Sequence, residues 1–205
     1  MNDQIFEAVV STVDTAGRPH VAPMGVRYRR LDDGRDGVLL MPFKPSTTLA
    51  NVLATGHAVL NLVVDTRVFA GCITGRRGPE VLPLQPAECI AGQRLANALR
   101  HLELQLVAQQ DDPQRPVLTL AVQHDASHAP FVGLNRAQAA VVEGAVLVSR
   151  LHLLPADKLR QEMAYLQIAI DKTAGPAEHE AWQWLRTAVD AHLANQGILP
   201  EERAP

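Results

Sequence analysis

The segment Lys44–Thr48 combines a cation with three hydroxyl groups, those of Ser46, Thr47 and Thr48. It opens the stretch "KPSTTLANVLATG", whose apolar residues share one face of a predicted helix that ends at Gly56. The first backbone N–H groups of a helix have no partner within the helix, so its start attracts anions. We therefore predict a phosphate site at Lys44, Ser46, Thr47 and Thr48. Ordinary helix capping by Ser46 or Thr47 would use the same residues and remains open at this point.

A second candidate is the predicted strand "HVAPMGVRY", which carries a proline and a glycine in its interior. Proline cannot donate to a strand ladder, and glycine gives up side-chain packing and chain entropy. One hypothesis is that a flat ring lies close to the backbone here. The other is that Gly25 marks a β-bulge that bends a barrel. The candidate residues for contact with the ring are Ala22, Pro23, Met24, Gly25 and Val26.

Two asparagines complete the candidate set. Asn51 lies in the predicted helix, and Asn61 lies in the alternating segment "HAVLNLVVD", from which we expect it to point inward. An exposed strand backbone, an anion-binding helix start and an inward amide together predict a barrel that binds a flat phosphorylated ligand. We predict neither a catalytic side chain nor a metal ligand.

Two further features carry less information. The segment "HDASH" contains His124, Asp125 and His128, which are residue types that bind metals. It is predicted to be a loop without a third partner, and a solvated loop is the preferred interpretation. Cys72 and Cys89 form no CxxC pair, and we expect both to be small buried residues in a reduced protein.

The elements that would position these residues follow from periodicity and turn residues. Strands are predicted at 4–14, 19–30, 37–43, 57–65, 102–106 and 117–122, with one internal helix at 46–56. The stretch 67–74 fits a helix or a strand, and 89–100 fits a short helix. This pattern indicates a small barrel of six or seven strands. Three helices follow, at 135–151, 155–175 and from about 182 to 197, and the last residues, "LPEERAP", are expected to fray. We predict a barrel domain at 1–130 and a helical region at 131–205 packed on it.

Composition excludes several classes of protein. The 205 residues carry a net charge of −3 with an isoelectric point near 6.2, so no basic surface for nucleic acid is indicated. No apolar run reaches the roughly 20 residues of a membrane helix. The first residues, "MNDQIFEAVV", have no basic start before an apolar core, so a secretory signal is not indicated. We expect a cytoplasmic protein without a nucleic-acid or membrane partner.

Several segments together resemble a known family. They are "APMGVR", "PSTTLANVLATG", "VLNLV", "LNRAQAAVVEGAVLVSRL" and "DKTAG", of which the most specific are Asn135–Arg136–Ala137 and Ser149–Arg150–Leu151. The chain is similar over nearly its whole length to the uncharacterised flavoproteins of domain-of-unknown-function family four-four-seven. These resemble flavin reductases in having an FMN-binding split β-barrel, to which they add a C-terminal helical part.

The resemblance implies a fold and a function. The fold would be mainly β with α: a split β-barrel with one internal helix, then about three helices. The cofactor would be FMN, bound at the residues named above, and the protein would be a homodimer with flavin at the subunit interface. The implied activity is that of a flavin-dependent oxidoreductase acting on an unknown small molecule. The alternative is a non-catalytic flavin-binding or pathway accessory protein.

Overall fold

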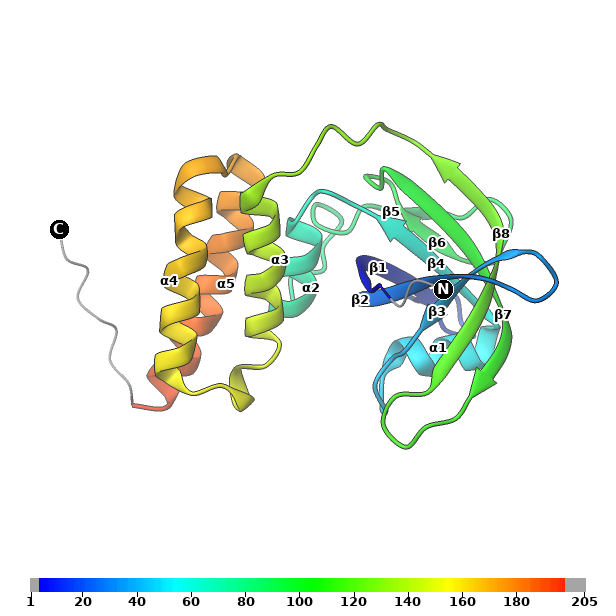
Figure 1. The fold of residues 1–205 in the computed structure, drawn as a ribbon, viewed down its shortest axis with the longest axis horizontal. Helices are drawn as coiled ribbons and strands as arrows, with labels where there is room; N and C mark the ends of the chain where they lie inside the picture. Colours follow the sequence, from blue (N-terminus) through cyan, green and yellow to red (C-terminus); the bar gives the residue numbers. More distant parts are fainter. Residues whose placement is uncertain (1–3, 198–205) are drawn as a thin grey trace. The chain divides into compact units, whose positions relative to one another are not determined.

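The computed structural model describes residues 4–197, so the expected fraying of "LPEERAP" lies outside the described residues. These residues form two compact units. The first comprises residues up to 64 together with 78–131, and the second comprises 65–77 together with the residues from 132 onward. Figure 1 shows the strands in the first unit and most of the helices in the second.

The first unit is a six-stranded antiparallel barrel with the strand order β1-β2-β3-β8-β7-β4, closed by pairing of β4 with β1. Its strands are β1 (Phe6–Val13), β2 (Pro19–Arg30), β3 (Asp36–Leu40), β4 (His57–Leu62), β7 (Arg100–Gln110) and β8 (Val117–Ser127). A separate two-stranded sheet consists of β5 (Leu84–Pro86) and β6 (Gln93–Leu95). The mixed β/α class and the barrel predicted from alternation are confirmed.

The barrel encloses an apolar core because alternate residues of each strand point inward. Valine and leucine dominate this core, which includes Val10, Val38, Leu60, Leu104 and Leu120. Helix α1 (Thr47–Thr55) adds Leu49 and Val52 to the same cluster, so one face of the helix is anchored in the barrel. The helix stops at Gly56, which adopts a left-handed φ of 75° that favours glycine.

The second unit is helical. It contains α2 (Arg67–Thr74), α3 (Arg136–Val148), the short 3₁₀ helix η1 (Leu151–Leu153), α4 (Ala156–Thr173) and α5 (Pro176–Asn195). The three predicted C-terminal helices are confirmed, and the undecided segment 67–74 is a helix. Residues 65–77 group with these helices although they precede residue 131 in sequence. The division at 130 and the packing of the helices on the barrel remain predictions. None of the helices described within residues 4–197 is long and apolar enough to cross a membrane.

Two local expectations are wrong. The stretch 89–100 contains the strand β6 and no helix. Strand β8 continues to Ser127, so His124 and Asp125 of the "HDASH" segment lie in a strand and only His128 follows it. Sequence periodicity missed this part of β8 because polar residues on both faces of a strand do not alternate with apolar ones.

Candidate functional site

The candidate ring-binding strand is β2, which has partners on both sides along only part of its length. Strand β1 pairs with it from Pro19 to Val26, whereas β3 pairs with it only from Val26 onward. Within the described chain, the segment Ala22–Gly25 therefore has β1 as a strand neighbour on one side and an open edge on the other. Pro23 lies in this segment, where its missing N–H is tolerated because an open edge leaves ladder positions unused.

Side chains of this segment alternate between the two faces of the barrel wall. Val26 lies in the core and Met24 packs against it, so Ala22, Met24 and Val26 point inward. Pro23 and Gly25 then point outward. A ligand lying on the outer face would contact Pro23 and Gly25 directly and would reach Val26 only through its backbone.

Gly25 is not part of a β-bulge. Pairing of β1 with β2 continues past it without a register shift, and Gly25 is not among the residues with positive φ. The bulge hypothesis is therefore wrong. A Cβ at this position would lie 2.6 Å from Cγ2 of Ile5, whose side chain is 52% exposed. Oε1 of Glu7 follows at 3.8 Å, so the space above Gly25 is bounded by two exposed side chains that can turn away.

The helix start predicted from the sequence is present and capped. Ser46 is the N-cap of α1, and its hydroxyl oxygen accepts a hydrogen bond from the N–H of Leu49 at 3.3 Å. Within residues 4–197, the N–H groups of Thr47 and Thr48 have no hydrogen-bond partner. The capping and the anion hypotheses are compatible, because the Ser46 hydroxyl can still donate its own hydrogen. Thr47 is exposed and Thr48 is buried.

The open edge of β2 and the start of α1 are neighbours. Leu40 is the last residue of β3 and pairs with Val26, so the segment Met41–Ser46 leaves the sheet where the edge of β2 opens. Helix α1 then packs against β1 and β2. Two of the three predicted groups, the strand and the helix start, are therefore brought together.

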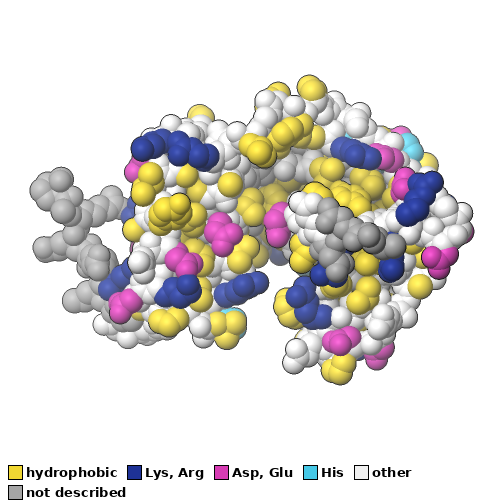
Figure 2. Space-filling view, viewed as in Figure 1, with side chains coloured by type: hydrophobic (Ala, Val, Ile, Leu, Met, Phe, Trp, Pro, Cys, Tyr) yellow, Lys and Arg dark blue, Asp and Glu magenta, His cyan; other side chains and the backbone are white. Residues whose placement is uncertain are grey.

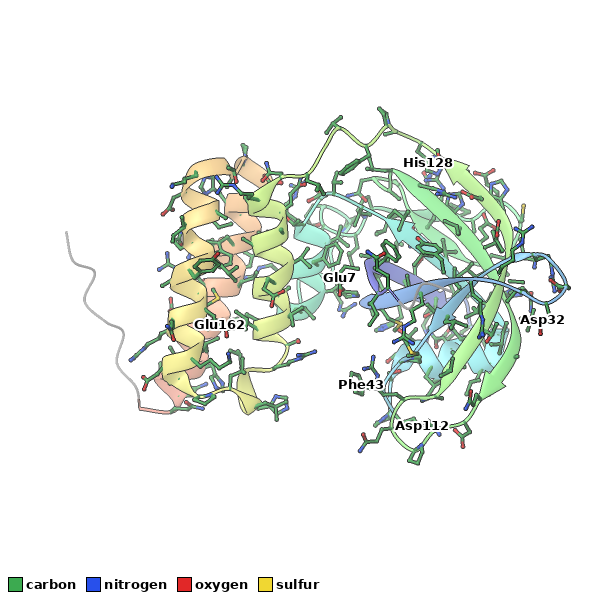
Figure 3. The ribbon with its side chains drawn as sticks, viewed as in Figure 1. Glu7, Asp32, Phe43, Asp112, His128 and Glu162 are labelled. Carbon is green, nitrogen blue, oxygen red and sulfur yellow. The ribbon has the colours of Figure 1, made fainter. Side chains whose placement is uncertain are left out.

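Sequence reasoning missed a second cation, which lies beside this segment. Arg115, in the turn between β7 and β8, donates to the carbonyl of Met41 at 3.2 Å and stacks 4.4 Å from the centre of the Phe43 ring. The N–H of Lys44 donates to the carbonyl of Gln114 at 2.8 Å. Figure 3 shows Phe43 and Asp112, from these two segments, at the same end of the barrel. The turn "DDPQRP" gave no signal of this approach, which depends on strand pairing.

Acidic groups balance these cations. The Lys44 ammonium forms an ion pair with the exposed carboxylate of Asp111 and lowers its pKa. The carboxylate of Asp112 accepts from the N–H groups of Gln114 and Arg115, at 2.8 and 2.7 Å, and these hydrogen bonds lower its pKa. The ion pair between Lys44 and Asp111 is exposed and contributes little free energy. An anion at the helix start could therefore replace Asp111 as the partner of Lys44 at a small cost in free energy.

The two candidate asparagines have structural partners. The side-chain N–H of Asn51 donates to the Thr12 hydroxyl at 3.0 Å and fastens α1 to β1. Asn61 is fully buried but does not point inward as expected. Its neighbour Leu60 lies in the core, so Asn61 faces outward. There its amide donates to the Ser11 hydroxyl at 3.0 Å, and its oxygen accepts from the N–H of Leu95 at 2.7 Å.

The burial of the two cysteines differs from the expectation. Cys72 is buried in α2, and burial raises the pKa of its thiol to about 11. Cys89 is exposed, so the expectation that both are buried is wrong for this residue.

The donor set at the helix start fits a phosphate group. It offers the two free N–H groups of Thr47 and Thr48, the Ser46 hydroxyl and the side chain of Lys44, with Arg115 near by. The adjoining outer face of β2 offers a surface with little side-chain bulk at Gly25. Both properties suit a ligand with a flat ring and one phosphate.

The fold is that of the split-barrel flavin proteins. An FMN-bound protein from Methanosarcina mazei, of family DUF447, has 21% identity and a TM-score of 0.76, with 91% of this chain and 96% of that chain covered. A 2-nitrobenzoate 2-nitroreductase from Pseudomonas fluorescens has 19% identity and a TM-score of 0.51, with 62% and 66% covered. A flavin reductase-like protein with a split-barrel domain from Shewanella frigidimarina has 14% identity and a TM-score of 0.51, with 62% and 69% covered.

The family is shown directly by the sequence. Residues 6–129 match the N-terminal domain described as "Protein of unknown function (DUF447)", and residues 135–187 match the second domain of the same family. The chain belongs to the DUF447 family. The resemblance stated from the sequence motifs is confirmed.

Proposed function

We propose that this protein binds FMN and acts as a flavin-dependent oxidoreductase on a small organic molecule. The observation that carries the proposal is the start of α1, where two free backbone N–H groups and the Ser46 hydroxyl lie beside the open edge of β2. The phosphate would bind at Lys44, Ser46, Thr47 and Thr48, and the ring would lie along Ala22–Val26. The likeness to the FMN-bound protein from Methanosarcina mazei supports the choice of ligand.

FMN is preferred over FAD because the site offers one compact anion-binding position. A dinucleotide needs a second phosphate position, which these residues do not supply. Arg115 is added to the proposed phosphate contacts, since it reaches the same segment. Asn51 and Asn61 are given a supporting role, because their amides hold α1 and β6 against β1 and β4.

The chemistry in this proposal belongs to the cofactor. Bound FMN would supply hydride or electron transfer, and the protein would bind and orient it. Ser46, Thr47 and Lys44 would fix one end of the ligand, and the backbone of β2 would hold the ring at van der Waals distance. No acid or base is required from the chain for this role.

A homodimer belongs to the same proposal. An open strand edge covers only one face of a flat ring, so a second copy could supply the opposite wall. Exposed apolar side chains of the barrel unit support the idea, among them Ile5, Phe6 and Phe43. Figure 2 shows hydrophobic side chains at the surface of the barrel unit, between groups of charged ones.

Two measurements test the proposal. The purified protein is denatured, and the released pigment is identified by chromatography. FMN is expected, and FAD, or no flavin after reconstitution, would contradict the binding proposal. NADH and NADPH are then added without oxygen to the FMN-loaded protein. Bleaching of the flavin absorbance supports the oxidoreductase, and a yellow protein inert to both would favour the non-catalytic alternative.

A further inference from the structure

A buried group of histidine and glutamate side chains lies on the outer face of the barrel, on β7 and β8. His101 and Glu103 alternate with Leu102 and Leu104, which lie in the core, so both point outward. Register places Glu103 opposite His124. His101 and Glu103 are nevertheless 0% exposed, and the loop 88–90 between β5 and β6 lies over Glu103. Such a cluster of ionisable groups needs a physical explanation.

Glu103 is held as a carboxylate. It accepts backbone hydrogen bonds from Glu88, Cys89 and Ile90 at 2.5, 2.7 and 2.9 Å. Three N–H donors on its two oxygens are the contacts of an acceptor-only, ionised carboxylate. The carboxylate therefore stabilises the loop 88–90 and keeps its charge.

This carboxylate decides the tautomer of His101. Nε2 of His101 lies 3.1 Å from Oε1 of Glu103, so Nε2 must carry the hydrogen that it donates to the carboxylate. Nδ1 of His101 then bears a lone pair. A carboxylate that orients an imidazole in this way is the usual outer partner of a metal-binding histidine.

Further ligand atoms gather around this position. Glu88, His101 and His124 each offer one ligand atom, and the three atoms lie within 4.8 Å of one another. Nε2 of His124 is 3.2 Å from Oε2 of Glu88, yet it is a buried atom without a hydrogen bond. Nε2 of His128 lies 2.8 Å from Nδ1 of His101. Ligand-type atoms from β7, β8 and the loop 88–90 thus lie close together, and the Nε2 hydrogen of His128 that bonds to His101 would be displaced by a bound metal.

We propose that Glu88, His101 and His124 bind a divalent transition metal, with zinc the best match, and that His128 is the fourth ligand. Three imidazoles and one carboxylate are a donor set that zinc accepts in tetrahedral geometry. Two nitrogens bound to one zinc lie roughly 3.3 Å apart, so His128 must move by about half an ångström. It is exposed and lines a cavity of about 660 Å³, which provides both that freedom and an entry path.

The site differs from the proposed phosphate site. His128 follows the end of β8, whereas Phe43 and Asp112 lie at the other end of the barrel (Figure 3). Four protein ligands would leave no open position, so the metal would be structural. It would tie the loop 88–90, which joins β5 to β6 outside the barrel ladder, to the barrel strands β7 and β8.

The test is zinc binding by the full chain, stripped of metal and titrated with zinc alone against a chromogenic chelator. One zinc per chain is expected, and tetrahedral cobalt absorption should appear when cobalt replaces zinc. The double variant Glu88→Gln with His124→Gln should bind zinc at least a hundredfold more weakly. His128→Ala should weaken binding about tenfold. His179→Gln, an exposed histidine on α5, and Cys89→Ser should leave zinc affinity unchanged.

Circular dichroism and flavin content of the same variants separate metal loss from misfolding and from the flavin proposal. Folded variants with normal flavin and lost zinc support the site. A wild-type chain that binds no stoichiometric zinc would overturn the proposal. Equal zinc affinity in the wild type and the double variant would also overturn the proposal. The histidine and glutamate side chains would then form only a hydrogen-bonded chain from Glu103 through His101 to His128. Unchanged affinity in His128→Ala would remove His128 from the ligand set.

Discussion

The phosphate site makes the sharpest prediction, through the double variant Thr47→Ala with Thr48→Ala. If these residues bind the phosphate of FMN, their hydroxyls contact only that group. FMN affinity should then fall while riboflavin affinity, which lacks the phosphate, stays the same. The fold should survive, because neither hydroxyl is the N-cap of α1 and the capping Ser46 remains.

The size of the effect follows from the number of bonds. A hydrogen bond to a charged group contributes about 1.5–3 kcal/mol, which is about tenfold to a hundredfold in affinity. Thr47 is exposed and Thr48 is buried, so we expect one strong contact, from Thr47, and a total near the lower half of this range. The backbone N–H groups persist in the variant, so binding of FMN should weaken but not vanish.

Fluorescence titration with FMN and with riboflavin gives both dissociation constants. The matched control is Thr55→Ala, in which the lost hydroxyl lies at the other end of α1 and bonds to the carbonyl of Asn51 at 2.9 Å. This control should not change the ratio of the two affinities. Equal losses for FMN and riboflavin in the double variant would refute the phosphate assignment, and so would an unchanged FMN affinity.

Other consequences can be measured separately. Gly25→Val should reduce flavin affinity at least tenfold with a nearly unchanged melting temperature of the apo-protein, because the new side chain meets the exposed side chains of Ile5 and Glu7, which can turn away. Unchanged flavin affinity would contradict the placement of the ring on β2. Arg115→Gln should weaken FMN more than riboflavin by about 1.5–3 kcal/mol, and a uniform loss would show that Arg115 acts only on the turn. Gly144→Ala should cost about 1–3 kcal/mol in chemical denaturation, because its Cβ would lie 2.7 Å from the Trp182 ring. With its pKa raised to about 11, Cys72 should be alkylated slowly below that pH and faster as pH rises toward it, whereas exposed Cys89 should react at once at neutral pH; two fast thiols would contradict the burial of Cys72.

Local sequence determined much of the barrel and of the candidate site. Alternation in β1 and β4 and the change of period at α1 are properties of neighbouring residues, as are the Ser46 cap and the Gly56 stop. The helix start can therefore be predicted without knowing any tertiary contact. The family motifs extended this interpretation to nearly the whole chain, since residues 6–129 and 135–187 both match domains of the DUF447 family.

What surrounds each residue was decided by tertiary structure. Arg115 reaches Phe43 only because β3 and β8 are neighbours in the barrel, and nothing near "DDPQRP" encodes that pairing. Asn61 faces outward because its neighbour Leu60 points into the core, and it is buried there because β6 lies against that side of the wall and supplies the N–H of Leu95.

The end of β8 shows most clearly what local sequence does not determine. His124 and His128 looked like a solvated loop because their polar neighbours follow no apolar pattern. In the fold, β7 brings His101 to them and the loop 88–90 covers Glu103. Local sequence determines which residues form a strand or helix, because propensity and periodicity act over a few residues. Which polar groups share one buried site depends on contacts between distant segments, and those exist only once the barrel has closed.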